Sequence, residues 1–335
     1  MGDPSTQALT HASARRFSAL AGACVLAATA LVATVPLELA LASVFLFAGP
    51  HNWMEFRYAI ARLPSRLSPF REFFLVAIAG MVLLTVGALA IPGAARFGGS
   101  TTTLARWATA WNLALVGWIA ALAFLRSRQK PVRDWTWVLP VALVAASLAC
   151  WNPGVWSLLL VYAHPIVSFV VLDRELGRHH RHWRPAYRAL LAALPLLIVV
   201  LLWSLRDAGP LPGEGTDALT MRIVAQAGGV QLTWLGPRAL VATLALLELL
   251  HYAVWIVVMP VVTGMGAPWR RVRVAIVRDS VVRRRVVRFA FGGLAVAVVA
   301  LWVAFTADYA RARDVYFTLA IAHVLGEVPM LLRLA

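Results

Sequence analysis

Long apolar stretches alternate with short polar ones along the whole chain. Charge-free stretches recur at residues 17–37, 73–95, 107–125, 135–172, 189–205, 249–269 and 289–307. Most of them are long enough to cross about 30 Å of hydrocarbon as a helix. Because they recur over the full length, the pattern predicts an all-α polytopic membrane bundle and excludes a soluble enzyme with a single anchor.

Turn residues divide these stretches into ten predicted membrane helices. Pro36 separates the first two, and Trp-Asn-Pro-Gly at 151–154 interrupts a stretch that is too long for one span. The first segment follows Arg15 and Arg16 like a secretory signal, but no convincing cleavage site follows, so we expect an uncleaved span. The ten segments are 17–35, 37–59, 73–93, 104–125, 134–150, 154–173, 187–206, 238–261, 288–308 and 314–333.

The distribution of basic residues predicts the orientation of the helices. Hydrophobic residues make up 61% of the chain and charged residues 14%, and the net charge is +16. Ten helices with a cytoplasmic N-terminus place 24 of the 31 lysine and arginine residues on the cytoplasmic side, as membrane proteins normally do. The positive charge then follows from topology and requires no nucleic-acid partner. We therefore expect cytoplasmic N- and C-termini and a bacterial inner (plasma) membrane location.

The same topology defines the expected domain organisation. Residues 1–16 form a cytoplasmic tail, and residues 17–335 form a single transmembrane helical domain. Within it, segment 207–237 is expected as the one long external loop and segment 262–287 as a basic cytoplasmic loop. The two cysteines fall at opposite expected depths, so we expect no disulfide.

Two basic segments on the predicted cytoplasmic side carry candidate binding chemistry. Arg270–Arg288 mixes eight arginines with valine and isoleucine, which favours an interfacial amphipathic helix on anionic lipid headgroups. The second segment holds His179, His180 and His182. We interpret it as a solvated basic loop, because adjacent histidines without carboxylate or cysteine partners make weak metal sites.

A small group of histidines and glutamates lies inside the predicted spans, where a charged residue costs about 2.5–3.5 kcal/mol at mid-membrane. The histidines are His51, His164, His251 and His323, and the glutamates are Glu55, Glu248 and Glu327. Each glutamate lies three or four residues from a histidine, which puts both side chains on one helix face. The pairs are His51 with Glu55, His251 with Glu248, and His323 with Glu327.

The four histidines can share one level of the membrane. They lie on the second, sixth, eighth and tenth predicted helices, which run in the same direction, about 10–14 residues from the outer ends. Four imidazoles with nearby carboxylates suit non-haem iron or another divalent metal that prefers nitrogen and oxygen. His and Glu at helical spacing also build metal sites in helical bundles. We therefore predict a metal site at these histidines, with the glutamates as catalytic carboxylates that ligate the metal or orient the imidazoles.

Three other interpretations of these residues remain open. Opposed histidines in a helical bundle can bind haem b, which would make the chain a membrane electron-transfer protein. Histidines and glutamates inside a membrane can also relay protons in a proton-coupled carrier. The same side chains can finally serve helix packing alone.

The second predicted helix resembles a known enzyme family. Pro50-His51 followed by Glu55 is similar to the Pro-His-x-x-x-Asp pattern near the start of the Brp/Blh-type β-carotene dioxygenases, bacterial integral-membrane enzymes that cleave carotene to retinal. The resemblance covers about six residues and the general plan of a four-histidine bundle, while the family's His-Phe-Gly and His-x-x-x-His motifs do not occur here. It implies that His51 is an iron ligand and that a carotenoid is one candidate substrate.

These features together predict an integral-membrane, metal-dependent oxidoreductase of the oxygenase type. A metal at mid-membrane is reached laterally by a carotenoid, lipid or quinone and by O₂, so the expected substrate is lipid-soluble. No Gly-rich phosphate loop, nucleophile elbow or Cys-pair metal motif occurs in the sequence.

Overall fold

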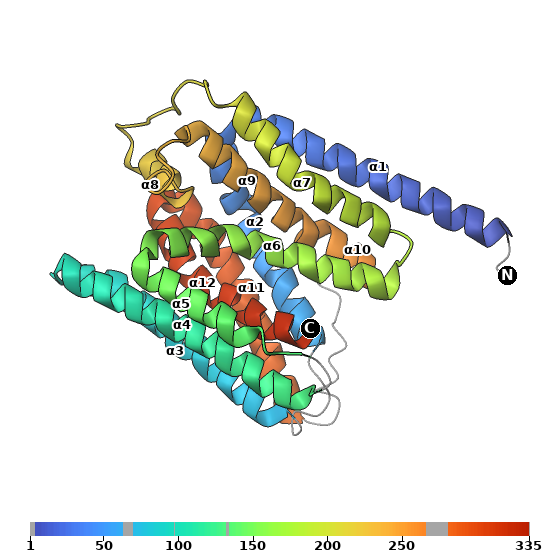
Figure 1. Cartoon of the computed structure of the whole chain (residues 1–335), viewed down its shortest axis with the longest axis horizontal. Helices are drawn as coiled ribbons and strands as arrows, with labels where there is room; N and C mark the ends of the chain where they lie inside the picture. Colours follow the sequence, from blue (N-terminus) through green and yellow to red (C-terminus); the bar gives the residue numbers. More distant parts are fainter. Residues whose placement is uncertain (1–3, 63–69, 97, 132–133, 266–280, 335) are drawn as a thin grey trace. The chain divides into compact units, whose positions relative to one another are not determined.

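The computed structural model describes residues 4–62, 70–96, 98–131, 134–265 and 281–334. This part of the chain is almost entirely helical and contains no β-strand (Figure 1). The helices are α1 (Pro4–Thr34), α2 (Pro36–Ala61), α3 (Arg71–Arg96), α4 (Thr101–Gln129), α5 (Val138–Trp151), α6 (Pro153–His179), α7 (Arg184–Ser204), α8 (Ala218–Gln226), α9 (Pro237–Ala253), the π-helical turn η2 (Val254–Val258), α10 (Met259–Thr263), α11 (Val281–Ala307) and α12 (Tyr309–Leu334).

Eight of the described helical segments are long and apolar enough to cross a membrane: those of α1, α3, α4, α6, α7, α9 to α10, α11 and α12. α5 has 14 residues, fewer than the roughly 20 that a span needs. α2 has 26 residues but carries polar ones such as Glu38, His51 and Glu55. The helices agree with the expected all-α membrane bundle, whereas the number of ten crossings stays a prediction.

Two predicted breaks between helices are confirmed. α1 gives way to α2 at Pro36, whose fixed φ suits the first turn of a helix. α5 ends at Trp151 and α6 begins at Pro153. The side-chain oxygen of Asn152 accepts a hydrogen bond from the backbone N–H of Val155 at 3.1 Å and so caps the start of α6.

Two polar segments contain more helix than the sequence reading expected. α1 begins at Pro4, so most of the predicted tail 1–16 is helical, because no helix breaker follows that proline. α8 lies inside the predicted loop 207–237. The carboxylate of Asp217 accepts a hydrogen bond from the backbone N–H of Thr220 at 2.7 Å, which caps the first turn of α8.

The basic segment before α11 is only partly described. α11 begins at Val281, seven residues before the predicted start, so the end of segment 262–287 is helical. Residues 266–280 lie outside the described residues, and they hold most of Arg270–Arg288. The expected interfacial amphipathic helix therefore stays a prediction.

The chain folds into two compact units. The first comprises Met1–Glu55 and Val161–Val272, and the second comprises Phe56–Leu160 and Arg273–Ala335. The boundaries fall inside α2 and α6, so each of these helices contributes to both units. Of the seven predicted site residues, five belong to the first unit and two to the second.

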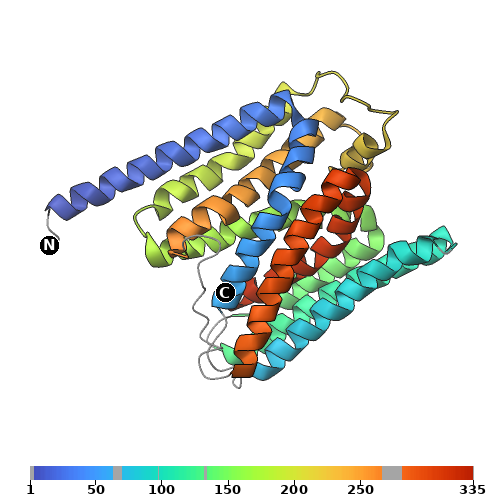
Figure 2. The same cartoon turned by 180° about the vertical axis from the view of Figure 1, so that it is seen from behind.

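α9 forms the centre of the first unit. It packs against α1, α7 and α8, and α1 also packs against α7 (Figures 1 and 2). Ala239, Ala242 and Ala245 of α9 are buried together with Val32 of α1 and Leu201 of α7. Small side chains let membrane helices approach closely. This packing fixes the backbone of the helix that carries one of the predicted histidines.

α3, α4 and α12 form the core of the second unit. Each packs against the other two, while α5 packs against α4 and α11 against α12. Trp118 of α4 donates a hydrogen bond from Nε1 to the carbonyl oxygen of Val76 at 2.9 Å, and Trp111 donates one to Leu84 at 2.7 Å. The Trp118 indole lies directly on Gly80, where a Cβ would overlap it. Glycine at this position therefore allows α3 and α4 to pack closely.

Candidate functional site

Three of the predicted histidines converge within the first unit. His51 lies on α2, His164 on α6 and His251 on α9. The ring centroids of His164 and His251 are 4.6 Å apart, and those of His51 and His251 are 5.3 Å apart. His51 and His251 are each 1% exposed, and His164 is half-buried. Residues far apart in the sequence, on three different helices, thus place three imidazoles in contact.

Each of these histidines lies close to a position where its helix lacks or alters a regular α-helical hydrogen bond. Pro50 precedes His51 and Pro165 follows His164, and a proline cannot donate the backbone hydrogen bond of a regular helix. His251 lies three residues before η2, in which the hydrogen bonds skip one residue more than in an α-helix. Such π-helical turns often occur at functional sites.

The orientation of the His51 ring is fixed by the backbone of its own helix. Its Nδ1 lies 3.0 Å from the carbonyl oxygen of Phe47. A carbonyl oxygen only accepts, so Nδ1 donates, and in the neutral ring the lone pair is on Nε2. Metal-ligating histidines are usually held in this way, with one ring nitrogen on a backbone carbonyl and the other on the metal.

Two of the three pairs of imidazoles are spaced closely enough to approach a shared metal ion. One ring nitrogen of His164 lies within 4.8 Å of one of His51, and one lies within 4.8 Å of a nitrogen of His251. Two nitrogens bound to one metal at about 2.0–2.1 Å are at most about 4.2 Å apart, so small movements would bring these atoms into ligand range. Ring centroids of neighbouring imidazole ligands would be about 4.5–5 Å apart at those bond lengths. The observed 4.6 and 5.3 Å are close to that spacing.

Two of the predicted carboxylates belong to the same unit. Glu55 is buried, one turn after His51, and Glu248 is half-buried, one turn before His251. Both are near enough to interact electrostatically with the imidazole of His164. Two carboxylates therefore lie near the imidazole of His164, and mixed imidazole and carboxylate ligands suit a divalent cation.

Tyr252 belongs to the same cluster and was missed by the sequence reading. Its ring centroid lies 4.7 Å from that of His51 and 5.7 Å from that of His251, and the residue is 6% exposed. An aromatic residue in an apolar helix ordinarily indicates core packing. The available signal was that Tyr252 directly follows an intramembrane histidine, so the two residues are neighbours on one helix.

His323 and Glu327 lie in the second unit, one turn apart on α12. Glu327 is 1% exposed and His323 is half-buried. The structure thus brings together three of the four predicted histidines and two of the three glutamates within the first unit. A role for His323 and Glu327 in metal binding stays a prediction.

The histidines at the turn between α6 and α7 have ordinary partners. His180 stacks on Trp183 with ring centroids 4.4 Å apart, and Nε2 of His179 lies 3.3 Å from a carboxylate oxygen of Glu175. Partial burial, helped by the neighbouring histidines, lowers the pKa of His180 below its ordinary value. These contacts agree with the interpretation of this segment as a basic loop.

A scan against protein-family models, a search of curated proteins and a search of solved structures found no match for this chain. Function must therefore be inferred from its own residues and geometry. The resemblance of residues 50–55 to the β-carotene dioxygenases stays an expectation from the sequence.

Proposed function

We propose that the protein is an integral-membrane, metal-dependent oxidoreductase that binds non-haem iron through His51, His164 and His251. The observation that carries this proposal is the contact of three imidazoles from three helices, with centroid distances of 4.6 and 5.3 Å. Imidazole nitrogens with carboxylates nearby suit iron and related divalent metals better than Mg²⁺ or Ca²⁺, which prefer oxygen ligands. Three protein ligands also leave coordination positions for substrate or O₂.

Bound iron would supply oxidative chemistry, and the residues of this chain would hold and orient it. The Nδ1 contact of His51 with Phe47 would present Nε2 to the metal. Glu55 and Glu248 would serve as further ligands or as carboxylates that orient the imidazoles. A lipid-soluble substrate such as a carotenoid, lipid or quinone could approach laterally. The resemblance at residues 50–55 adds support for a carotenoid.

The ring spacing favours a metal ion over haem b. Two imidazoles on opposite faces of one haem iron would have centroids about 6 Å apart, because each metal–nitrogen bond is about 2 Å long. The distances of 4.6 and 5.3 Å are shorter. A porphyrin does not fit between rings in such contact.

We further propose that ten helices cross a bacterial inner membrane, with both termini in the cytoplasm. α2 and α5 would be the two crossings beyond the eight long apolar segments. The support is the charge distribution, since this topology places 24 of the 31 lysine and arginine residues on one side.

Metal analysis combined with an optical spectrum of the purified full-length protein tests the proposal. The expected result is a fixed ratio of iron to protein without the Soret band of a haem. A Soret band would identify a haem protein instead. Protein that retains no metal, and takes none up when Fe²⁺ is added under anaerobic conditions, would refute the metal centre.

Glutamate variants separate the oxidoreductase from a proton-coupled carrier, the second candidate that the carboxylates near His164 support. Glu55→Gln and Glu248→Gln should weaken metal binding or turnover about 10–100-fold, as expected for residues that support metal ligands. A carrier would instead lose pH-dependent transport in reconstituted vesicles, with no metal to lose.

A further inference from the structure

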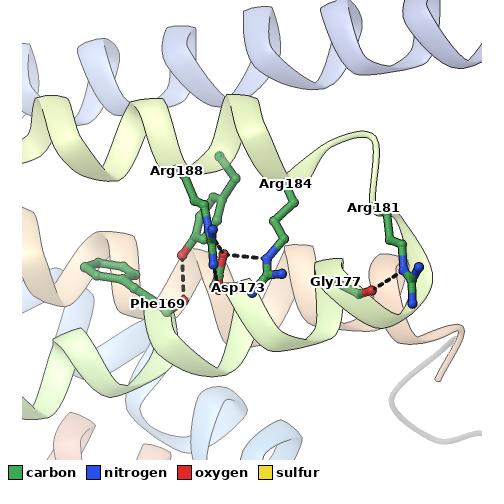
Figure 3. Close-up of polar contacts among 7 residues, drawn as sticks. Phe169, Asp173, Gly177, Arg181, Arg184 and Arg188 are labelled. Atoms are coloured by element: carbon green, nitrogen blue, oxygen red, sulfur yellow. Dashed lines mark hydrogen bonds and ion pairs between the residues drawn. The ribbon is translucent and has the colours of Figure 1, made fainter.

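One carboxylate holds two arginines at the junction of α6 and α7 (Figure 3). Arg184 binds Asp173 through Nε and Nη2, at 3.0 and 2.7 Å, and Arg188 does the same at 2.8 and 3.1 Å. Nearby, the hydroxyl of Tyr187 donates to the carbonyl oxygen of Phe169 at 2.9 Å, which ties the two helices together. The two guanidinium groups are therefore fixed side by side on a braced helical hairpin.

Most of the donor capacity of the two arginines is still available. A guanidinium carries five N–H donors. Each of these two guanidinium groups donates through two of its nitrogens to the carboxylate of Asp173. Asp173 neutralises only one of the two positive charges. The side chain of Arg184 is 32% exposed and that of Arg188 is 58% exposed, so their outer edges reach the surroundings.

The rest of the turn adds to this positive charge. Arg178 pairs with Glu175 at 2.6 Å. Arg181 donates from Nε to the carbonyl oxygen of Gly177 at 3.0 Å (Figure 3). Residues 173–188 contain five arginines and two carboxylates, a net charge of +3 before any histidine is protonated.

We propose that Arg184 and Arg188 form a binding site for the phosphate of an anionic phospholipid headgroup. The turn lies between two segments that can cross a membrane, Pro153–His179 and Arg184–Ser204, which places it at the level of the headgroups. Arginine binds phosphate bidentately, and a guanidinium already held by Asp173 loses little side-chain entropy on binding. This site is independent of the metal centre and of the segment Arg270–Arg288.

The test uses full-length protein in a neutral detergent, titrated with mixed micelles of phosphatidylglycerol or phosphatidylcholine, with bound lipid counted by native mass spectrometry. The wild type should retain phosphatidylglycerol in preference to phosphatidylcholine. Arg184→Gln/Arg188→Gln should lower the affinity for phosphatidylglycerol about 30-fold, because each basic residue near an anionic surface contributes about fivefold. Arg206→Gln is the matched control, since Arg206 pairs with Asp207 in another loop, and it should change the affinity less than about twofold.

Two further measurements make the assignment specific. Arg184→Lys/Arg188→Lys keeps the charge but loses the planar forks, and it should still bind clearly more weakly than the wild type. If the double glutamine variant does not fold, the double lysine variant still tests whether the two arginines bind the lipid phosphate. Sodium phosphate at the same concentration as the lipid should not displace the lipid from the wild type. The proposal is overturned if the lysine pair binds as well as the wild type, if free phosphate displaces the lipid at equal concentration, or if the control loses as much affinity as the glutamine pair.

Discussion

Removing His251 is the sharpest test of the metal centre, because this ring contacts both of the others. His251→Ala leaves only His51 and His164 of the three imidazoles. It also opens a cavity at a position that is 1% exposed, which by itself destabilises a packed core. His251→Gln fills most of that volume without an imidazole and therefore separates loss of a ligand from loss of packing.

The expected magnitude follows from the position of the ring. Replacing a residue that only orients a metal ligand lowers the affinity for the metal about 10–100-fold. His251 lies 4.6 and 5.3 Å from its two neighbours, centroid to centroid, so its loss removes a ligand and should exceed the upper end of that range. At a free metal concentration ten times the wild-type Kd, the fraction of protein with metal bound would fall from about 90% in the wild type to below about 10% in the variant.

The measurement is metal content at equilibrium, by elemental analysis of the wild type and both variants dialysed against one buffered Fe²⁺ concentration. His182→Ala, which removes an exposed histidine from the turn between α6 and α7, should keep the wild-type content. Size-exclusion chromatography confirms that each protein is folded. His251 is not a metal ligand if His251→Gln is folded and still binds metal within about threefold of the wild-type affinity.

Three further predictions concern packing, pH and orientation. Gly80→Ala should lower the free energy of unfolding by about 1–3 kcal/mol, because a Cβ there overlaps the indole that lies on it. Gly117→Ala on the facing helix, where a Cβ meets nothing within 4 Å, should cost less in the same thermal unfolding assay. Because burial lowers the pKa of His180 below its ordinary value, the unfolded chain takes up protons more readily than the folded one, and stability falls as the pH drops below 6.5. His180→Phe keeps the stacking and should reduce that loss in melting curves recorded from about pH 7 to about pH 5. With the native cysteines replaced by alanine, a cysteine at Gly209 should react with an impermeant maleimide outside intact cells and one at His182 should not, and the reverse pattern would invert the topology.

The helices could be predicted because apolar length and turn residues act locally. Each of the ten predicted segments lies largely within a helix of the structure, and both proline-marked breaks are present. α8 was missed because it is short and its stability depends on packing: Ile223 and Val224 are buried with Leu240 and Val241 of α9. A nine-residue helix in a polar segment has too little periodicity to indicate that contact.

Of the candidate site, only those residues could be predicted that are individually unfavourable inside a membrane. The histidines were identified because an ionisable group inside a membrane requires a partner or a function. Tyr252 carries no such cost, so only the three-dimensional arrangement reveals it next to His51. His323 and Glu327 belong to a different compact unit, which the sequence does not reveal because depth in the membrane does not determine which helices pack together.

The missing or altered helical hydrogen bonds close to the three histidines argue against packing as the whole explanation of this cluster. Membrane helices pack closely when they are regular and carry small residues at the contact, as in the alanine-lined part of α9. Pro50, Pro165 and η2 give up regular hydrogen bonds at three separate places, each within a few residues of an imidazole. A binding site needs ligands held by a packed helix, together with nearby backbone that can adjust its direction. α9 provides both at His251, since its alanines fix the helix up to the ring and the π-helical turn follows three residues later. Ionisable side chains close to missing or altered helical hydrogen bonds on three helices therefore support the proposed ion site over structural polar packing.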